Sequence, residues 1–213
     1  QLIYKIFSSI SIILKSIFSM NNTIKKNIEE WSNHPFCEET QNKLNHLKND
    51  KVKLNDAFYK NLEFGTGGMR GLMGVGTNRI NKYTIGKNTQ GISNFINSNY
   101  HVDKSVVIAY DCRKNSSELA RIVAEVFSAN KIMVYLFSAM RPTPELSYAV
   151  RELNCLCGIV LTASHNPPEY NGFKVYWKDG GQIVPPIDNL LISEIEKLKF
   201  KDVNFNSRTE LIE

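Results

Sequence analysis

The sequence comprises 213 residues, of which 42% are hydrophobic and 22% are charged, as in ordinary soluble proteins. This length suffices for one substantial domain with its own core. The net charge of +5 is modest and no basic run carries interleaved aromatic residues, which excludes a nucleic-acid-binding protein. The four cysteines form no CxxC pair and no zinc-type spacing, so we expect reduced packing cysteines in a cytoplasmic protein.

Residues 1–19 are rich in Ile, Phe and Ser, and the apolar stretch between Lys5 and Lys15 is too short to span a bilayer. No small-residue cleavage site follows it. We interpret these residues as an apolar extension of doubtful origin, upstream of a polar segment that begins at Met20. A targeting segment is the alternative, and no membrane partner is expected.

The remaining chain shows alternating secondary-structure signals after a polar, glycine-rich start. Residues 20–50 are predicted to form one or two polar helices, and the glycines of residues 60–81 indicate sharp turns or close backbone approach. The predicted strands are 105–110, 132–137 and 156–162, and residues 171–183 are predicted to form an extended pair that turns at Asp179–Gly181. The predicted helices are 85–96, one that begins with an Asn115–Glu118 capping box, one with Thr143 as N-cap and Pro144 at its first position, and 187–198. This alternation predicts an α/β fold, a three-layer α/β/α domain with a mixed sheet.

The segment 162–174 follows the third predicted strand and reads Thr-Ala-Ser-His-Asn-Pro-Pro-Glu-Tyr-Asn-Gly-Phe-Lys. A strand followed by a rigid polar loop can hold one nucleophile at a sheet edge. Ser164 is the natural nucleophile, His165 is its neighbour, and Lys174 can fold back across a hairpin. Ligands of such sheets bind beyond the carboxyl ends of the strands, where both Asp111–Arg113 and Ser164 fall. The alternative is a surface turn that is merely stiffened by its prolines.

Three blocks of sequence between residues 60 and 200 carry a family resemblance. They are Glu63–Gly71 continuing to Gly76–Asn81, Ala109–Arg113 with Asn115–Ser116, and residues 162–174. In this order they resemble the Phe-Gly-Thr-x-Gly-x-Arg-Gly motif, the Tyr-Asp-x-Arg turn and the phosphoserine loop of the α-D-phosphohexomutase superfamily (phosphoglucomutase/phosphomannomutase). Residues 175–183 resemble the branch that contains phosphopentomutase and glucose-1,6-bisphosphate synthase.

The resemblance implies an intramolecular phosphotransferase in which Ser164 is a phosphoserine. A phosphoryl group would move between hydroxyls of a hexose or pentose phosphate through a bisphosphate intermediate, so a sugar 1,6-bisphosphate is the expected activator. The phosphoserine would bind Mg²⁺ through its phosphate, which makes Ser164 a metal ligand. The family's other ligands come from an Asp-Gly-Asp loop of the second domain. This sequence has none, because Asp179-Gly180 is followed by another glycine.

The resemblance also implies roles for residues around Ser164. Lys174 would be the general base or acid, with a plain phosphate-pairing cation as the alternative. His165 would orient the sugar or shuttle a proton, and Asn166 would fix the loop and border the substrate. Arg70 is expected to bind phosphate, or else to tie the glycine-rich loop to the domain. Arg113 is expected to bind phosphate, with a local ion pair to the preceding aspartate as the alternative.

The resemblance covers only the first of the family's four domains. We expect residues 20–200 to form the phosphohexomutase α/β/α domain I, and residues 201–213 to begin a linker to a missing second domain. The expected partners are a sugar phosphate and domains II–IV of the same protein, without which the chain would be nearly inactive. The alternative is a non-catalytic domain that binds phosphosugars or a partner protein.

Overall fold

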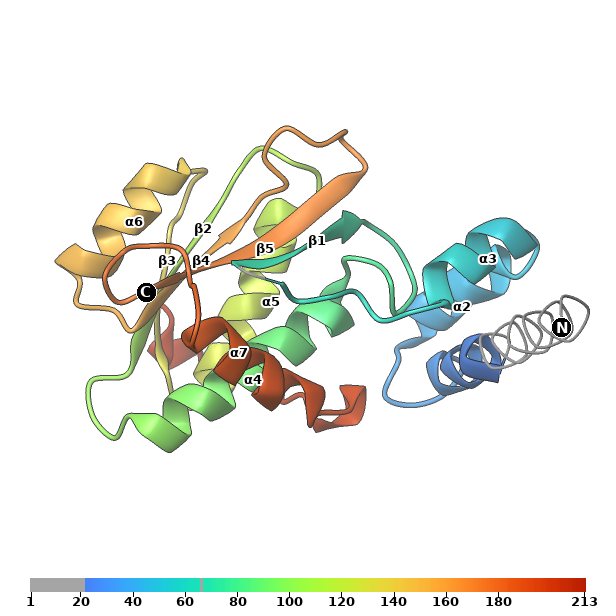
Figure 1. The fold of residues 1–213 in the computed structure, drawn as a ribbon, viewed down its shortest axis with the longest axis horizontal. Helices are drawn as coiled ribbons and strands as arrows, with labels where there is room; N and C mark the ends of the chain where they lie inside the picture. The colour runs from blue at the N-terminus through green and yellow to red at the C-terminus, as the bar shows by residue number, and fades with distance from the viewer. Residues whose placement is uncertain (1–21, 66) are drawn as a thin grey trace, which may run out of the picture. The chain divides into compact units, whose positions relative to one another are not determined.

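A computed structural model describes residues 22–65 and 67–213 (Figure 1). The extension expected at residues 1–19 lies outside the described residues. The chain divides into two compact units, one of residues up to 61 together with 75–78, and one of residues 62–74 and 79–213. No helix among the described residues is long and apolar enough to cross a membrane.

The first unit consists of helices around one aromatic side chain. Its helices are residues 22–31, α2 (Glu38–Leu47) and α3 (Lys51–Phe58). The fully buried Trp31 ring stacks on Phe36 with centroids 4.3 Å apart and meets Phe58 edge-on at 5.7 Å. The prediction of one or two helices within residues 20–50 is confirmed, and α3 follows them.

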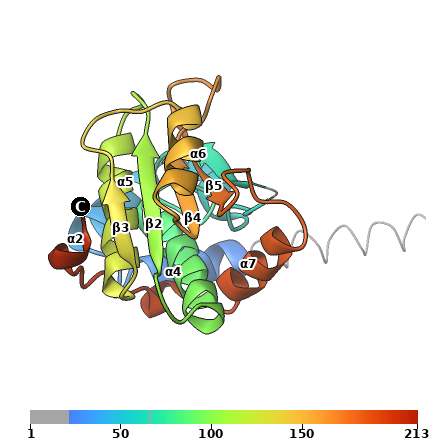
Figure 2. The same ribbon diagram turned by 90° about the vertical axis from the view of Figure 1, so that its left-hand side faces the viewer.

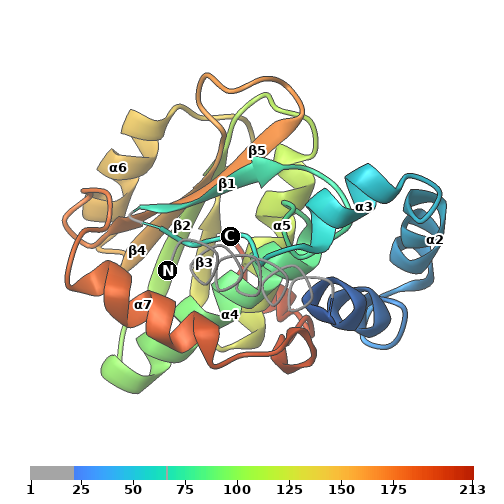
Figure 3. The same ribbon diagram turned by 45° about the vertical axis from the view of Figure 1, so that its right-hand side comes forward.

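The second unit is built on a five-stranded mixed sheet in the order β1-β5-β4-β2-β3. The strands are β1 (Gly68–Leu72), β2 (Ser105–Tyr110), β3 (Met133–Leu136), β4 (Cys157–Leu161) and β5 (Tyr170–Trp177). The β-branched strands β4, β2 and β3 run parallel. In contrast, β5 lies antiparallel between β4 and β1 (Figure 3). The predicted mixed sheet is confirmed.

Helices cover both faces of this sheet (Figures 1 and 2). One face carries α4 (Lys82–Asn99), α5 (Ser116–Ala129) and α7 (Ile187–Glu196), whose apolar sides form the larger core with Phe173 and Ile159. The other face carries α6 (Thr143–Glu152), which packs Leu146 and Val150 against β2 and β4. Each helix buries its apolar stripe on the sheet, as a layered α/β domain requires. The predicted three-layer α/β/α architecture is confirmed.

Two helix starts differ from the sequence prediction. Asn115 precedes α5 with a left-handed φ of 63°, and its side chain makes no capping hydrogen bond, so the predicted Asn115–Glu118 capping box is wrong. The N-cap of α6 is Pro142, and the Thr143 side chain caps nothing. A true capping box begins α4, where the Asn81 side chain accepts from the Thr84 amide and Thr84 Oγ1 accepts from the Asn81 amide.

The end of the chain packs on the sheet. Residues 171–183 are predicted to form a hairpin or extended pair that turns at Asp179–Gly181, and the backbone does fold back there: Tyr176 bridges Gln182, the Trp177 amide donates to the Gly181 carbonyl at 2.8 Å and the Ile183 amide donates to the Val175 carbonyl at 3.1 Å. In addition, β5 pairs with β1 and β4. Further on, Ile212 lies parallel to Val134 of β3 as an isolated bridge. Whether residues 201–213 lead to another domain stays a prediction.

Candidate active site

The loop after β4 holds Ser164 exposed and in an unusual backbone conformation. Its φ is +56°, in the left-handed region that costs a non-glycine residue on the order of 1–3 kcal/mol. The Ser164 amide donates to Thr162 Oγ1 at 3.0 Å, and the Asn166 amide donates to the Ala163 carbonyl at 3.1 Å. Ser164 Oγ lies 3.4 Å from Nδ1 of His165. The loop is therefore an ordered turn that presents one hydroxyl beside one imidazole.

Two cationic side chains project from one face of the neighbouring strands. Arg70 of β1 lies opposite Gly172 of β5, and Lys174 follows two residues later. Residues opposite each other, and residues two apart, share a sheet face, so the two Cα atoms lie roughly 7–8 Å apart on the same side. Lys174 also lies opposite Val160, which packs on α6. Within the described part of the chain, neither cationic group forms a hydrogen bond or ion pair.

The same register places Ser164 beside these cations. The Thr162 amide donates to the Gly172 carbonyl at 3.1 Å, which extends the β4–β5 ladder by one step past β4. Gly172 is the residue opposite Arg70, and Lys174 is two residues away from it. The register thus places Arg70 and Lys174 near the carboxyl end of β4, from which the loop that carries Ser164 and His165 leaves the sheet.

The site also lies where the direction of the strand connections changes. From β2 the chain crosses through α5 to β3, and from β3 it returns through α6 to β4 on the other side of β2. The carboxyl ends of β2 and β4 therefore form the topological switch point at which such sheets bind ligands. The Asp111 amide donates to the Leu161 carbonyl at 3.2 Å across this point. As predicted, Asp111–Arg113 and Ser164 follow the carboxyl ends of β2 and β4, and Arg113 donates to the Ser164 carbonyl at 2.7 Å.

Arg113 contacts the loop after β4 and the neighbouring aspartate through its guanidinium. Its guanidinium donates to carbonyl groups of the loop after β4, and its Nε lies 3.5 Å from Oδ2 of Asp111, which is the local ion pair that the sequence left open. Sequence reasoning missed Ser116 and Asn171, which join the loop to the start of α5. Their only sequence signal is that both lie within the blocks that carry the family resemblance.

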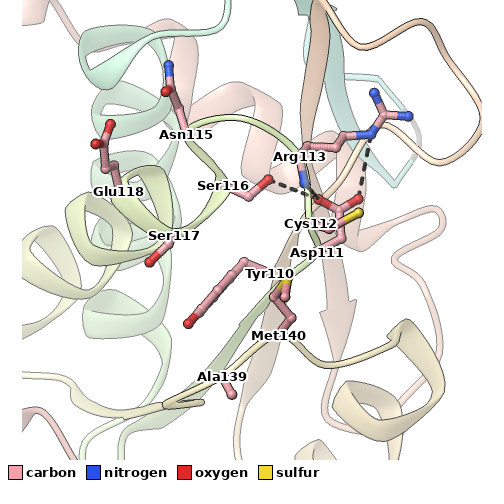
Figure 4. A pocket seen from close by; sticks show the side chains of 10 residues that line it. All are labelled: Tyr110, Asp111, Cys112, Arg113, Asn115, Ser116, Ser117, Glu118, Ala139 and Met140. Atoms are coloured by element: carbon pink, nitrogen blue, oxygen red, sulfur yellow. Dashed lines mark hydrogen bonds and ion pairs between the residues drawn. The ribbon is translucent and has the colours of Figure 1, made fainter.

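A cavity of about 390 Å³ is lined in part by the turn that carries Arg113 (Figure 4). Its walls come from the end of β2, the start of α5 and the loop after β3. The lining residues are Tyr110, Asp111, Cys112, Arg113, Asn115, Ser116, Ser117, Glu118, Ala139 and Met140. Neither Ser164 nor Lys174 lines it, so this cavity borders the candidate site without containing its nucleophile.

The described residues include four free cysteines but no cluster of metal-binding side chains. All four thiols are free, with Cys112 exposed and Cys155 and Cys157 buried, and burial raises the pKa of both buried thiols. No group of three or more His, Cys, Asp or Glu side chains in the described ranges could hold a metal ion. The described side chains therefore do not form a complete Mg²⁺ site. A phosphate on Ser164 would supply some of the oxygen ligands that Mg²⁺ needs, but not all of them.

Comparisons with known proteins match the segment that contains the candidate site. Residues 61–202 match the sequence profile of the phosphoglucomutase/phosphomannomutase α/β/α domain I. Phosphoglucomutases of Staphylococcus aureus strains RF122 and MRSA252 are 44% and 43% identical over 147 residues, which cover 69% of this chain. These residues are 26% of each relative, so the chain spans about a quarter of their length.

Solved structures show the same architecture. A phosphoglucomutase/phosphomannomutase family protein from Burkholderia thailandensis superposes with a TM-score of 0.55 at 25% identity, over 70% of this chain and 31% of that one. A protein from Thermus thermophilus superposes with a TM-score of 0.60 at 27% identity, over 70% of this chain and 33% of that one. The profile match covers more than half of the chain and includes every residue of the candidate site. The chain therefore belongs to the phosphoglucomutase/phosphomannomutase family and contains its α/β/α domain I.

Proposed function

We propose that this chain is the phosphoserine-bearing domain of a phosphosugar mutase, with Ser164 as the residue that carries the phosphoryl group. The observation behind the proposal is the pair of unpaired cations, Arg70 and Lys174, that share a sheet face beside Ser164 in the part of the chain that the structure describes. A phosphoserine adds a charge of about −1.5 to −2 at neutral pH. Two cations without protein partners among the described residues supply the opposite charge at that position, and Arg70 can bind a phosphate through two N–H groups.

The proposed transfer needs one bond exchange at phosphorus. The bond between Ser164 Oγ and phosphorus breaks while a sugar hydroxyl oxygen forms a new bond to the same phosphorus. The proton of that hydroxyl passes to Lys174 as general base, and Ser164 Oγ takes up a proton, for which His165 Nδ1 at 3.4 Å is the nearest imidazole atom. The resulting sugar bisphosphate then returns its other phosphoryl group to Ser164, with Lys174 as general acid. Such transfers depend mainly on positioning and charge neutralisation.

Other parts of the machinery must come from outside the described residues. The relatives are about four times as long as the matched segment, and we propose that domains II–IV of the same protein complete the site. Mg²⁺ would be held by the phosphate on Ser164 together with ligands from those domains. The substrate is proposed to be a hexose phosphate, with the pentose phosphates of the branch that residues 175–183 resemble as the alternative.

The test uses the complete protein with Ser164→Ala and, as a matched control, Ser138→Ala in the loop after β3. We expect Ser164→Ala to lower turnover of glucose 1-phosphate by at least about 10³-fold, as for loss of a covalent nucleophile, and Ser138→Ala to leave it unchanged. Intact-mass and peptide mapping should find one phosphoryl group on Ser164 of the unaltered protein. Near-normal turnover by Ser164→Ala would refute the proposal. An unphosphorylated protein that still binds glucose 1-phosphate would instead indicate a non-catalytic phosphosugar-binding domain.

A further inference from the structure

The terminal nitrogens of the Arg113 guanidinium donate only to protein carbonyls. Its two terminal nitrogens donate to four carbonyls of the loop, those of Ser164 and Asn166 at 2.7 Å, Pro167 at 3.0 Å and Tyr170 at 3.1 Å. Its Nε pairs with Asp111, and the side chain is only 11% exposed. The two terminal nitrogens together carry four N–H groups and make four hydrogen bonds, so the end of the side chain that could bind a phosphate is already used.

We propose that Arg113 is a positioning residue that clamps the loop 164–170 and does not touch the substrate. This inference rests on the proposed role of Ser164. Among the described residues, the carbonyls of Ser164 and Asn166 accept from Arg113 alone. The clamp binds these carbonyl oxygen atoms to one largely covered guanidinium group. A carbonyl that turned toward a phosphorylated Ser164 would instead place negative partial charge beside a dianion.

The guanidinium is itself held by a network at the start of α5. One Asp111 oxygen faces Nε of Arg113, while the other accepts from the Arg113 amide and from Ser116 Oγ, both at 3.0 Å (Figure 4). Ser116 in turn accepts from Asn171 Nδ2 at 3.0 Å, and Asn171 Oδ1 accepts from the Gly172 amide at 2.8 Å. Asn171 is fully buried at the start of β5, directly after the loop.

The network therefore fixes the loop along its length. Arg113 holds its carbonyls from Ser164 to Tyr170, and Asn171 anchors the residue that follows. Ser164 occupies a left-handed backbone conformation that is unfavourable for serine unless its surroundings impose it. The clamp supplies that constraint, because releasing the Ser164 carbonyl would let the residue relax to negative φ. Arg113 thus acts on the reaction through the geometry of Ser164.

Hydrogen exchange on the 213-residue chain tests the clamp without reference to phosphate. In the unaltered chain, the amides of Asn166 and Tyr170 should be protected although they lie in a surface loop, because both donate within the loop. Arg113→Met should speed exchange in residues 164–170 by at least about 10-fold and leave β2 and β4 unchanged, since hydrogen bonds to a charged group are lost. Arg141→Met is the matched control, because the polar contacts of the Arg141 side chain are with Glu145 and the Met140 carbonyl, both outside this loop.

Arg113→Lys keeps the charge but lacks the planar five-donor fork, so it covers the case in which Arg113→Met fails to fold. Loop exchange equal to that of the unaltered chain in a folded Arg113 variant would overturn the clamp. In the complete protein, Arg113→Lys should lower kcat by about 10-fold or more with KM within about 2-fold, whereas a direct phosphate ligand would raise KM. If the loop is protected from exchange but Ser164 carries no phosphate, the proposed function is refuted and the clamp is supported. If Ser164 carries phosphate but loop exchange in Arg113→Lys is unchanged, the clamp is refuted and the proposed function is supported.

Discussion

Replacing Gly172 by alanine should separate the strands that carry the two cations. A Cβ atom at this position would lie 2.5 Å from the Thr162 carbonyl oxygen and 2.9 Å from that of Met69, well inside the 3.4 Å at which ordinary van der Waals contact begins. Both oxygens are backbone atoms on either side of β5, Met69 in β1 and Thr162 directly after β4, so no side-chain rotation can relieve the contact. Relief requires β4 and β1 to move away from β5, which weakens the ladders on both sides.

Overpacking in a well-packed region costs about 1–3 kcal/mol, and a contact with backbone on two sides should reach the upper part of that range. Urea denaturation of the purified chain should therefore show Gly172→Ala less stable by about 3 kcal/mol. Gly65→Ala is the matched control in the same unit, since a Cβ atom there meets nothing within 4 Å. A Gly172→Ala chain with the stability of the Gly65→Ala chain would refute this reasoning about the spacing of the strands.

Two further predictions concern the thiols and a helix cap. Burial raises the pKa of the Cys155 and Cys157 thiols, so fewer of them are thiolates at mildly alkaline pH. Iodoacetamide should therefore label the exposed Cys112 well before either buried cysteine, which peptide mapping measures. Equal labelling of all three in the folded chain would contradict the burial. Asn81→Ala removes the cap of α4 and should cost about 1 kcal/mol in urea denaturation, and an unchanged midpoint would show that the capping box contributes nothing.

The strands and helices of the parallel half of the sheet could be predicted from periodicity alone. The run at residues 105–110 forms β2 at the predicted positions, and the helix at 187–198 is close to α7. In these segments the spacing of apolar residues along the sequence matches the positions that are buried in the fold. The glycine-rich β1 gave no strand signal, because strand pattern depends on side chains that glycine lacks, and its pairing with β5 joins residues about a hundred positions apart.

The residues of the candidate site were named from the sequence, but their contacts could be predicted only in part. Ser164, His165, Arg70 and Lys174 were named from sequence, and the register of β1, β4 and β5 explains why they meet. Arg113 shows the limit of such reasoning. An arginine after an aspartate can bind phosphate or protein, and the choice depends on where the carbonyls of a distant loop point.

The pairing of the last residues with β3 has a consequence for the behaviour of the protein in concentrated solution. The Leu136 amide donates to the Glu213 carbonyl at 2.7 Å, and the Glu213 amide donates to the Val134 carbonyl at 2.9 Å. β3 stands at the border of the sheet, where free N–H and C=O groups can recruit a strand from another molecule. Residues 212–213 occupy part of that border. Removing the segment after Asn206 would bare β3 and favour edge-to-edge self-association, so this short stretch also guards the domain against aggregation.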